Sequence, residues 1–345
     1  MIATTVVGSY PQPGWLVDRE RFRGNVVPRI RRPEIWRVAP AQLEEAQDDA
    51  VRIAVADMER AGIDVVSDGE QRRESYFNRF ATALGGLDPD RPGSAIARLG
   101  RPTPVPRVVG PIERVKPVSV SEAAFLRSVT DRRIKITVPG PFTLSCLAED
   151  EHYRDPERLA MAYASAVNAE LRELEPIVDW LQLDEPYLQA QPDRARAYGV
   201  ATIDRALAGL VKPTCVHLCF GYAFSHALAG STKSGGYEFL AELERSSATQ
   251  VSIEAAQPRL DVRALAGLPS KTIVLGVLDL GDAIAETPDV VARRLEAALK
   301  HVPAGRLVAA PDCGMKYLPR DVARAKRAAL VGGARLVASP TGQEG

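Results

Sequence analysis

A histidine and two cysteines stand at positions where their side chains could share one metal ion. His217 and Cys219 occupy alternate positions at the end of a short β-branched run, Cys313 follows another such run, and Glu254 ends a third. Alternate side chains of a strand point to the same face, so His217 and Cys219 should project together. One imidazole, two thiolates and one carboxylate suit Zn²⁺, because soft sulfur favours zinc over harder ions. The competing interpretation is that the cysteines are small buried apolar side chains.

The other cysteines and histidines have simpler interpretations. Cys215 shares the face of His217, and Cys146 lies where a helix begins after the third run; both are expected to pack as buried apolar side chains. His226 and His301 lie in helical segments without an evident partner, and His152 lies in an acidic loop. The candidate metal ligands are therefore His217, Cys219, Glu254 and Cys313.

The elements that must position these residues form a regular alternation. Eight short runs alternate with longer segments whose apolar residues recur every three or four positions, which predicts an α/β fold with a parallel sheet closed into a (β/α)₈ barrel. A doubly wound open sheet is the alternative. The carboxyl ends of barrel strands meet at one mouth, where the candidate ligands fall. We expect strands at 2–7, 64–67, 134–138, 180–183, 214–218, 250–253, 272–277 and 307–310, and helices at 43–58, 156–178, 195–211, 288–301 and 320–330.

Two stretches interrupt this alternation. Residues 12–40 are rich in proline and arginine and are interpreted as a long loop after the first strand. Residues 72–132 are interpreted as an insertion after the second strand, either a hairpin or a lid. Neither stretch is long enough to predict a second domain, so residues 1–345 are expected to form one barrel domain.

Composition and charge narrow the class of protein. The 345 residues are 46% hydrophobic and 26% charged, which is typical of a packed soluble chain and excludes a disordered or fibrous protein. Lys and Arg number 44 and Asp and Glu number 44, so no net charge favours nucleic acid or a membrane surface as a partner. The absence of a signal sequence and of a long apolar run predicts a cytoplasmic protein. Four cysteines are too few for a disulfide scaffold.

Eight ordered motifs carry a resemblance to a known family. The chain resembles the catalytic barrel of the cobalamin-independent methionine synthases, a lineage that also includes barrels of the uroporphyrinogen decarboxylase type. Each motif stands at the end of one expected strand. The motifs are GSYPQ at 8–12, DGE at 68–70, GPFTLSC at 140–146, LDEP at 183–186, HLC at 217–219, IEA at 253–255, GVLD at 276–279 and PDCG at 311–314.

The resemblance implies roles for particular residues. It implies that zinc is bound by His217, Cys219, Glu254 and Cys313. It also implies that the amino acid homocysteine is held by Ser9, Glu70 and Asp184, of which Glu70 and Asp184 are the candidate catalytic residues. Two carboxylates on one rim are appropriate for an α-ammonium group. The alternative for such residues is helix capping or pairing with an arginine, such as Arg72 or Arg73 beside Glu70.

Together these features predict a zinc-dependent S-methyltransferase that forms methionine. A thiol of pKa about 8.5 is mostly protonated at neutral pH, and zinc coordination removes that proton. Two thiolates and one carboxylate give the zinc site a net formal charge of about −1, so the bound substrate sulfur stays electron-rich. We therefore expect the sulfur to attack a methyl group in line.

Two positions depart from the family pattern. A histidine proposed to protonate the folate donor is replaced by Gly281, and a tryptophan that contacts the pterin is replaced by Leu147. A methyl group on folate nitrogen is a poor electrophile without such an acid, so the donor stays open among folate, a corrinoid and other methyl compounds. Full-length members also carry a second barrel in front. A corrinoid protein or a second copy of the chain is a candidate partner. The arginine-rich segments 19–37 and 91–107 are candidates for binding an anion or a corrinoid protein. The simpler interpretation of these segments is solvated surface charge.

Three other functions remain compatible with parts of this pattern. An epoxyalkane:coenzyme M transferase-like enzyme would keep the zinc and change the electrophile to an epoxide. A zinc-binding protein without turnover would close the site with four ligands. A metal-free decarboxylase of the uroporphyrinogen type would have no use for the thiolates of H-x-C and P-D-C-G.

Overall fold

Eight parallel strands form the barrel in this computed structural model, which describes residues 2–22, 27–98, 100–233 and 236–338. The strands lie in the order β1-β11-β10-β9-β8-β7-β5-β2. A parallel bridge between Thr5 and Val65 joins the first strand of this order to the last. The predicted barrel is therefore confirmed, and the open sheet is excluded. Strand bounds are β1 Ala3–Thr4, β2 Val65–Val66, β5 Arg133–Pro139, β7 Trp180–Asp184, β8 Thr214–Leu218, β9 Gln250–Ile253, β10 Thr272–Gly276 and β11 Leu307–Ala310.

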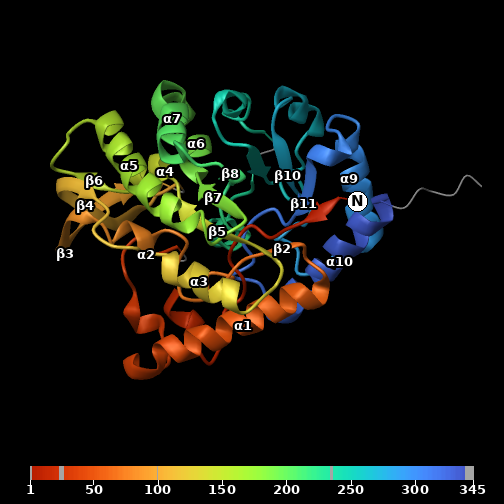
Figure 1. Ribbon diagram of the computed structural model, residues 1–345, viewed down its shortest axis with the longest axis horizontal. Helices are drawn as coiled ribbons and strands as arrows, with labels where there is room; N and C mark the ends of the chain where they lie inside the picture. Colours follow the sequence, from red (N-terminus) through yellow and green to blue (C-terminus); the bar gives the residue numbers. More distant parts are fainter. Residues whose placement is uncertain (1, 23–26, 99, 234–235, 339–345) are drawn as a thin grey trace, which may run out of the picture.

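Long helices surround the barrel at the predicted places (Figure 1). Their ends follow local chemistry: the Asp155 side chain accepts hydrogen bonds from two amides of the first turn of α5, and Gly62 ends α1 in the left-handed conformation at φ 89°. The helix expected at 195–211 begins at Pro192 and ends at Leu207, and the last helix continues beyond residue 330 to Ala338. The bounds are α1 Leu43–Ala61, α5 Pro156–Leu174, α7 Pro192–Leu207, α9 Pro288–Leu299 and α10 Arg320–Ala338. None of the described helices is long and apolar enough to cross a bilayer.

The insertion after the second strand is a hairpin followed by a barrel helix. Strands β3 (Gly85–Ile96) and β4 (Pro102–Glu113) are antiparallel, and β6 (Glu149–Asp150) pairs with β4. Helix α3 (Val120–Ser128) contacts β5 and α5, as expected of the helix between the second and third barrel strands. The hairpin strands lie within residues 85–113, which is a shorter stretch than the predicted insertion at 72–132. Figure 1 shows the hairpin at one end of the molecule beside α5, and its buried valines belong to the main apolar cluster.

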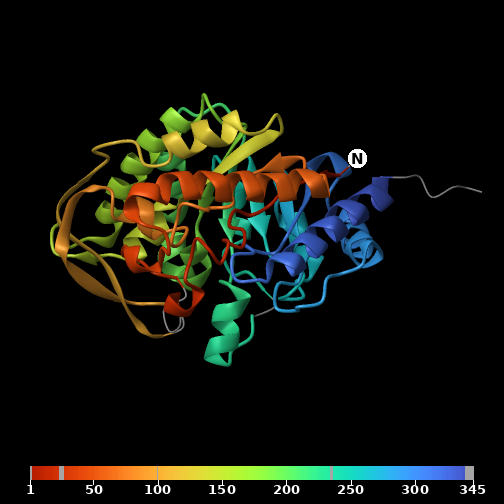
Figure 2. The same ribbon diagram turned by 90° about the horizontal axis from the view of Figure 1, so that it is seen from below.

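Short elements occupy the barrel mouth and the loops. Helices α4 (Pro141–Cys146), α6 (Pro186–Ala190) and α8 (Ala223–Ala229) follow β5, β7 and β8, and α2 spans Asn78–Ala81. In Figure 2 helix α8 projects from the body of the molecule. The segment 12–40, outside residues 23–26, is mostly the expected loop. The 3₁₀ turns are η1 Arg19–Phe22, η2 Pro33–Ile35, η3 Pro40–Gln42, η4 Ala241–Arg245, η5 Val262–Gly267 and η6 Ala304–Arg306.

Candidate metal and substrate site

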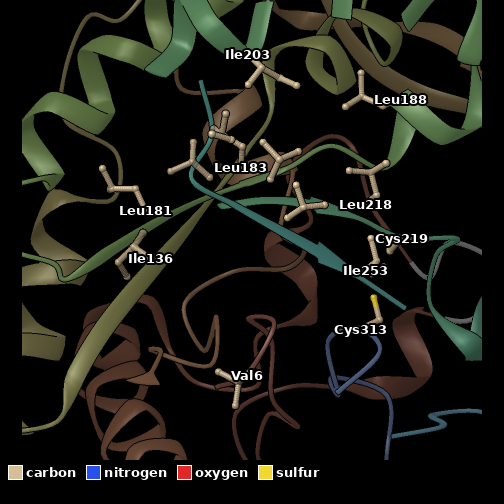
Figure 3. Close-up of a cluster of buried hydrophobic side chains, with 14 of the residues drawn as sticks. Val6, Ile136, Leu181, Leu183, Leu188, Ile203, Leu218, Cys219, Ile253 and Cys313 are labelled. Atoms are coloured by element: carbon tan, nitrogen blue, oxygen red, sulfur yellow. The ribbon is translucent and has the colours of Figure 1, made fainter. Parts of the chain in front are cut away.

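Three of the four predicted metal ligands meet at the barrel mouth. Donor atoms of His217, Cys219 and Cys313 all lie within 4.8 Å of one another, and all three residues are buried. His217 lies on β8 and Cys219 just beyond its end, while Cys313 arrives from the loop after β11. In Figure 3 the sulfur of Cys313 points toward Cys219. The shared strand face and the parallel sheet thus bring together residues almost 100 positions apart in sequence.

The two ring nitrogens of His217 have different surroundings. Nδ1 lies 2.9 Å from the hydroxyl of Ser252, its register partner on β9. Nε2 is buried and has no hydrogen-bond partner among the described residues. A metal-binding histidine typically uses one nitrogen for the metal and anchors the other on a neighbouring polar group. The orientation of His217 fits that arrangement.

The two thiols of the cluster are electrostatically coupled. The hydrogen bond with Cys313, helped by the neighbouring His217, holds the pKa of Cys219 well below its usual range. The same contact with Cys219, together with burial, raises the pKa of Cys313. The cluster therefore stabilises one thiolate even in a buried place, which is the form that binds metal.

The Pro-Asp-Cys-Gly loop is held in place by its aspartate. Asp312 accepts hydrogen bonds from the amides of Ala255, Ala256 and Gln257 at 3.2, 3.0 and 2.6 Å. A Cβ at Gly276 would lie within 2.6 Å of the Asp312 backbone, so the end of β10 must be glycine for the loop to approach. The first residue of the GVLD motif thus makes room for the loop that carries Cys313.

Glu254 lies outside the three-residue cluster. Its Oε1 accepts a hydrogen bond from the Phe220 amide at 3.0 Å, and its Oε2 forms a buried ion pair with Lys233. This arrangement does not place Glu254 in the cluster, so its role as a metal ligand stays a prediction. Nothing in the local sequence around Lys233 indicated this contact.

The predicted substrate residues face the same cavity as the metal cluster. This cavity has a volume of about 340 Å³. Two carboxylates, a serine hydroxyl and the sulfur and nitrogen donors of the metal cluster all belong to residues that line this cavity. Among its lining residues are Ser9, Glu70, Asp184, His217, Cys219 and Cys313.

Glu70 is strained, buried and partly unpaired. It adopts a left-handed backbone conformation at φ 53°, and its amide donates to Asp68 Oδ1 at 3.0 Å. Its Oε1 accepts from the Thr137 hydroxyl at 3.3 Å, while Oε2 is buried without a described hydrogen-bond partner. Burial raises the pKa of Glu70 to about 7. An oxygen in this condition is available for a cationic ligand.

The arginines next to Glu70 in sequence are occupied elsewhere. Arg72 pairs with Asp48, and Arg73 donates to Glu122 at 3.0 Å and to the Thr137 carbonyl at 2.8 Å. The alternative in which Glu70 simply pairs with its neighbours is therefore not what the structure contains. Arg73 still acts at longer range, because its charge opposes the burial effect on the pKa of Glu70.

Asp184 is oriented by a chain of polar contacts inside the barrel. Its Oδ1 accepts from Gln182 Nε2 at 2.7 Å, and Gln182 Oε1 accepts from Lys135 Nζ at 2.7 Å. Burial raises the pKa of Asp184. Sequence reasoning missed Lys135 and Gln182, although Gln182 and Asp184 stand two residues apart on one strand, which places them on the same face.

The next residue, Glu185, has a structural role. Its carboxylate accepts hydrogen bonds from the amides of Phe142 and Thr143 at 2.9 and 2.8 Å, at the start of α4. A Cβ at Gly140 would collide with this carboxylate. The motifs GPFTLSC and LDEP are thus linked by helix capping.

Ser9 lies at the rim, in contact with a residue that sequence reasoning missed. Its hydroxyl lies 3.3 Å from that of Tyr222, and its carbonyl accepts from the Met315 amide at 2.8 Å. A Cβ at Gly314 would collide with the Ser9 hydroxyl, which explains the glycine after Cys313. Ser9 is thereby held beside the cysteine loop.

The remaining cysteines and His226 are outside the cluster. Cys215 is buried in an apolar group with Trp180 and Val274, and Cys146 contacts Gln191 at 3.6 Å, so both pack as predicted. His226 does have partners, unlike its prediction: it contacts the Phe220 carbonyl at 2.8 Å and the Ser231 hydroxyl at 2.9 Å. Its helix, α8, folds back against the loop that follows Cys219.

The two positions that depart from the family pattern do not line the cavity. Leu147 is fully buried in the main apolar cluster. The Gly281 amide donates to Asp279 Oδ1 at 2.8 Å, within the turn after β10. Neither residue supplies an acid to the cavity.

Comparison with known proteins identifies the family. Residues 2–335 match the family model described as the catalytic domain of cobalamin-independent synthase. The chain belongs to the cobalamin-independent methionine synthase family. The methionine synthases of Saccharolobus solfataricus and Sulfurisphaera tokodaii are 31% and 29% identical to it, covering 98% of this chain and 95% and 93% of theirs. Both relatives extend over nearly the same length as this chain.

A solved structure agrees with this assignment. A B12-independent methionine synthase from Shewanella sp. W3-18-1, in complex with selenomethionine, superposes with a TM-score of 0.88 at 33% identity, covering 98% of both chains. A structure from Listeria monocytogenes shares the fold, with a TM-score of 0.71 at 20% identity. Membership of this family decides against the decarboxylase alternative. It also gives no support to a corrinoid partner, because the family is cobalamin-independent.

Proposed function

We propose that the chain is a zinc-dependent methyltransferase that converts homocysteine to methionine. The observation that carries this proposal is the meeting of three metal-donor side chains with two buried carboxylates around one cavity. Family membership supports methyl transfer by a methionine synthase. The metal, the acceptor and the residue roles are the parts proposed here, together with a cytoplasmic location.

The donor set fits zinc. His217 presents a buried nitrogen that has no hydrogen-bond partner within the described ranges of the chain, and Cys219 and Cys313 present two soft sulfurs. These three donors lie beside the cavity, and Glu254 remains the proposed fourth ligand. Bound zinc would supply Lewis acidity that lowers the pKa of a substrate thiol. The cavity beside the donors favours turnover over closed zinc storage.

The carboxylates give the acceptor its orientation. Glu70 and Asp184 would bind the α-ammonium group, since each has a carboxylate at the cavity and burial strengthens charge-assisted hydrogen bonds. Ser9, in the loop after β1, lines the same cavity and would contact the same amino acid. The Shewanella relative was solved with selenomethionine, an analogue of the expected product, which supports an amino-acid ligand here.

A donor panel tests this function. The protein is loaded with zinc and incubated with homocysteine and, separately, methyltetrahydrofolate, methylcobalamin or simple methylated sulfur compounds. We expect methionine from at least one donor and none after zinc is stripped. Full activity in the metal-stripped protein would refute the zinc role. An epoxide opened by coenzyme M, without methionine from homocysteine, would establish the epoxyalkane transferase alternative instead.

A further inference from the structure

A single backbone carbonyl joins three loops of the barrel mouth. The Arg73 carbonyl accepts hydrogen bonds from Gln12 Nε2 at 3.1 Å and from Lys316 Nζ at 2.9 Å. Gln12 belongs to the loop after β1, Arg73 to the loop after β2 and Lys316 to the loop after β11. These are the loops of the GSYPQ, DGE and PDCG motifs. The parts of the site proposed for the amino acid and for the metal therefore meet at one atom.

The carbonyl ends the turn, residues 70–73, that carries the Glu70 carboxylate. The Arg73 amide donates to the Glu70 carbonyl at 3.1 Å and closes the turn. Gln12 Nε2 also donates to the Gln71 carbonyl at 3.0 Å, in the middle of the turn. A left-handed backbone such as that of Glu70 persists only where surrounding contacts determine it. Gln12 thus holds the turn against the loop after β1.

The loop that carries Cys313 is tied to the same place. Lys316 lies three residues after Cys313, so its position follows that of the cysteine. The Met315 amide donates to the Ser9 carbonyl at 2.8 Å, which fixes this loop against the loop after β1 as well. Lys316 adds the direct link to the turn of Glu70, because its ammonium reaches the Arg73 carbonyl.

Both donors make this link inside the protein. Gln12 is 3% exposed and Lys316 is 4% exposed. A hydrogen bond in such a place is stronger than in water, whereas a buried amine without a partner is costly. Burial lowers the pKa of Lys316 to about 8. A methionine of similar length would avoid the desolvation of the amine, so the lysine is best accounted for by the position that it fixes.

We propose that Gln12 and Lys316 are positioning residues that fix the span between the Glu70 carboxylate and the metal cluster, and thereby set the chain length of the amino-acid thiol. This inference rests on the proposed function, in which the ammonium group binds Glu70 and the sulfur reaches the metal. Homocysteine has two methylene groups between its α-carbon and its sulfur, and cysteine has one. A fixed span that fits the first rejects the second, and one methylene is typically worth about 10- to 200-fold in discrimination.

Two thioethers that differ by one methylene test the span without any methyl donor. The zinc-loaded protein is titrated with methionine or S-methylcysteine in a calorimeter. We expect the unmodified protein to bind methionine more tightly by about tenfold or more. Lys316→Met and Gln12→Met should each lower this preference about threefold, and the double variant about tenfold, because one or both hydrogen bonds to the carbonyl are lost.

Lys271→Met is the matched control. Lys271 is also a buried lysine that donates to a backbone carbonyl, that of Ser246 at 2.6 Å, but it precedes β10 at the opposite end of the barrel. This variant should keep the preference for methionine. If Lys316→Met does not fold, Gln12→Met tests the proposal, because it leaves the bond from Lys316 in place.

The ratio of the two affinities separates spacing from charge. Lys316 also lowers the pKa of Glu70 through its charge, and loss of that charge would weaken both ligands equally. Equal weakening, or an unchanged ratio in the folded variants, would overturn the proposal. Equal binding of the two ligands by the unmodified protein would overturn it too. A protein that binds neither ligand would refute the proposed acceptor, and this inference with it, so the two failures are distinguishable.

Discussion

Cys215 and Cys219 lie four residues apart along β8 and its extension, yet their surroundings differ completely. Both are buried. Cys215 packs inside the barrel with Val274 and Val308, and burial raises its pKa to about 12. Cys219, at the mouth, lies beside a histidine and a second cysteine, which hold its pKa low. Position along the barrel axis, rather than residue type or burial, decides which of the two thiols has other metal-donor side chains beside it.

The largest expected effect is the difference in zinc binding and activity between substitutions of these two cysteines. Cys219→Ser is expected to abolish binding of about one zinc per chain and to lower activity more than about a hundredfold, since loss of an outer partner alone costs about 10- to 100-fold. Cys215→Ala should retain zinc. Metal analysis and methionine formation measure both variants. Equal zinc loss in the two would contradict the comparison.

A similar contrast between the barrel mouth and the barrel interior exists for Asp184 on β7 and Lys135 on the neighbouring strand β5. Asp184, at the barrel mouth, is expected to contact the substrate. Lys135, inside the barrel, contacts Gln182, which in turn donates a hydrogen bond to Asp184. Asp184→Asn should raise the KM for homocysteine about 10- to 100-fold, as expected for a hydrogen bond to a charged group. Lys135→Met should raise it by less than about tenfold.

The control for this pair is 4-mercaptobutyrate, a thiol acceptor without the ammonium group. Its KM should not change in either variant, because the ammonium contact is the one removed. Equal losses with both acceptors would show that Lys135 only supports the fold. Zinc content should stay the same throughout.

Substitution of Ser252 tests whether a hydrogen bond orients His217 at the barrel mouth. Ser252→Ala removes the partner of His217 Nδ1, and we expect zinc affinity to fall about tenfold. Competition with a chelator measures the change. Thr249→Ser, on the loop before β9, is a control that retains its hydroxyl contacts with Thr214. Unchanged zinc affinity in Ser252→Ala would show that the imidazole is oriented by packing alone.

The smallest effect concerns the pH dependence of amino-acid binding. The pKa of Glu70 is raised to about 7 by burial, against the opposing charges of Arg73 and Lys316 and with the help of Asp184 and Asp68. Because an ammonium group needs the ionised carboxylate, methionine affinity should fall about threefold from pH 7.5 to 6.5. Calorimetry at both pH values measures it. Glu70→Gln should bind weakly at both, and a pH effect that persists in this variant would assign it to another group.

Much of the fold and three members of the metal cluster could be predicted from sequence. Alternating runs specified the barrel, and the period of two in a strand placed His217 and Cys219 on one face. The insertion was predicted too broadly, because α3 has a weak amphipathic pattern and follows an irregular hairpin. The contact between Glu254 and Lys233 could not be foreseen, since a loop residue 21 positions away carries no periodic signal.

By itself, the sequence determined the order of strands and helices, the residue types at each strand end and, through them, the family. Tertiary structure alone decided which of those residues share a space: Cys313 beside Cys219, Lys135 behind Asp184, and arginines from two distant segments around one cavity. The reason is that periodicity reports local backbone geometry, whereas closure of the barrel and the path of its loops depend on packing between residues far apart in the chain.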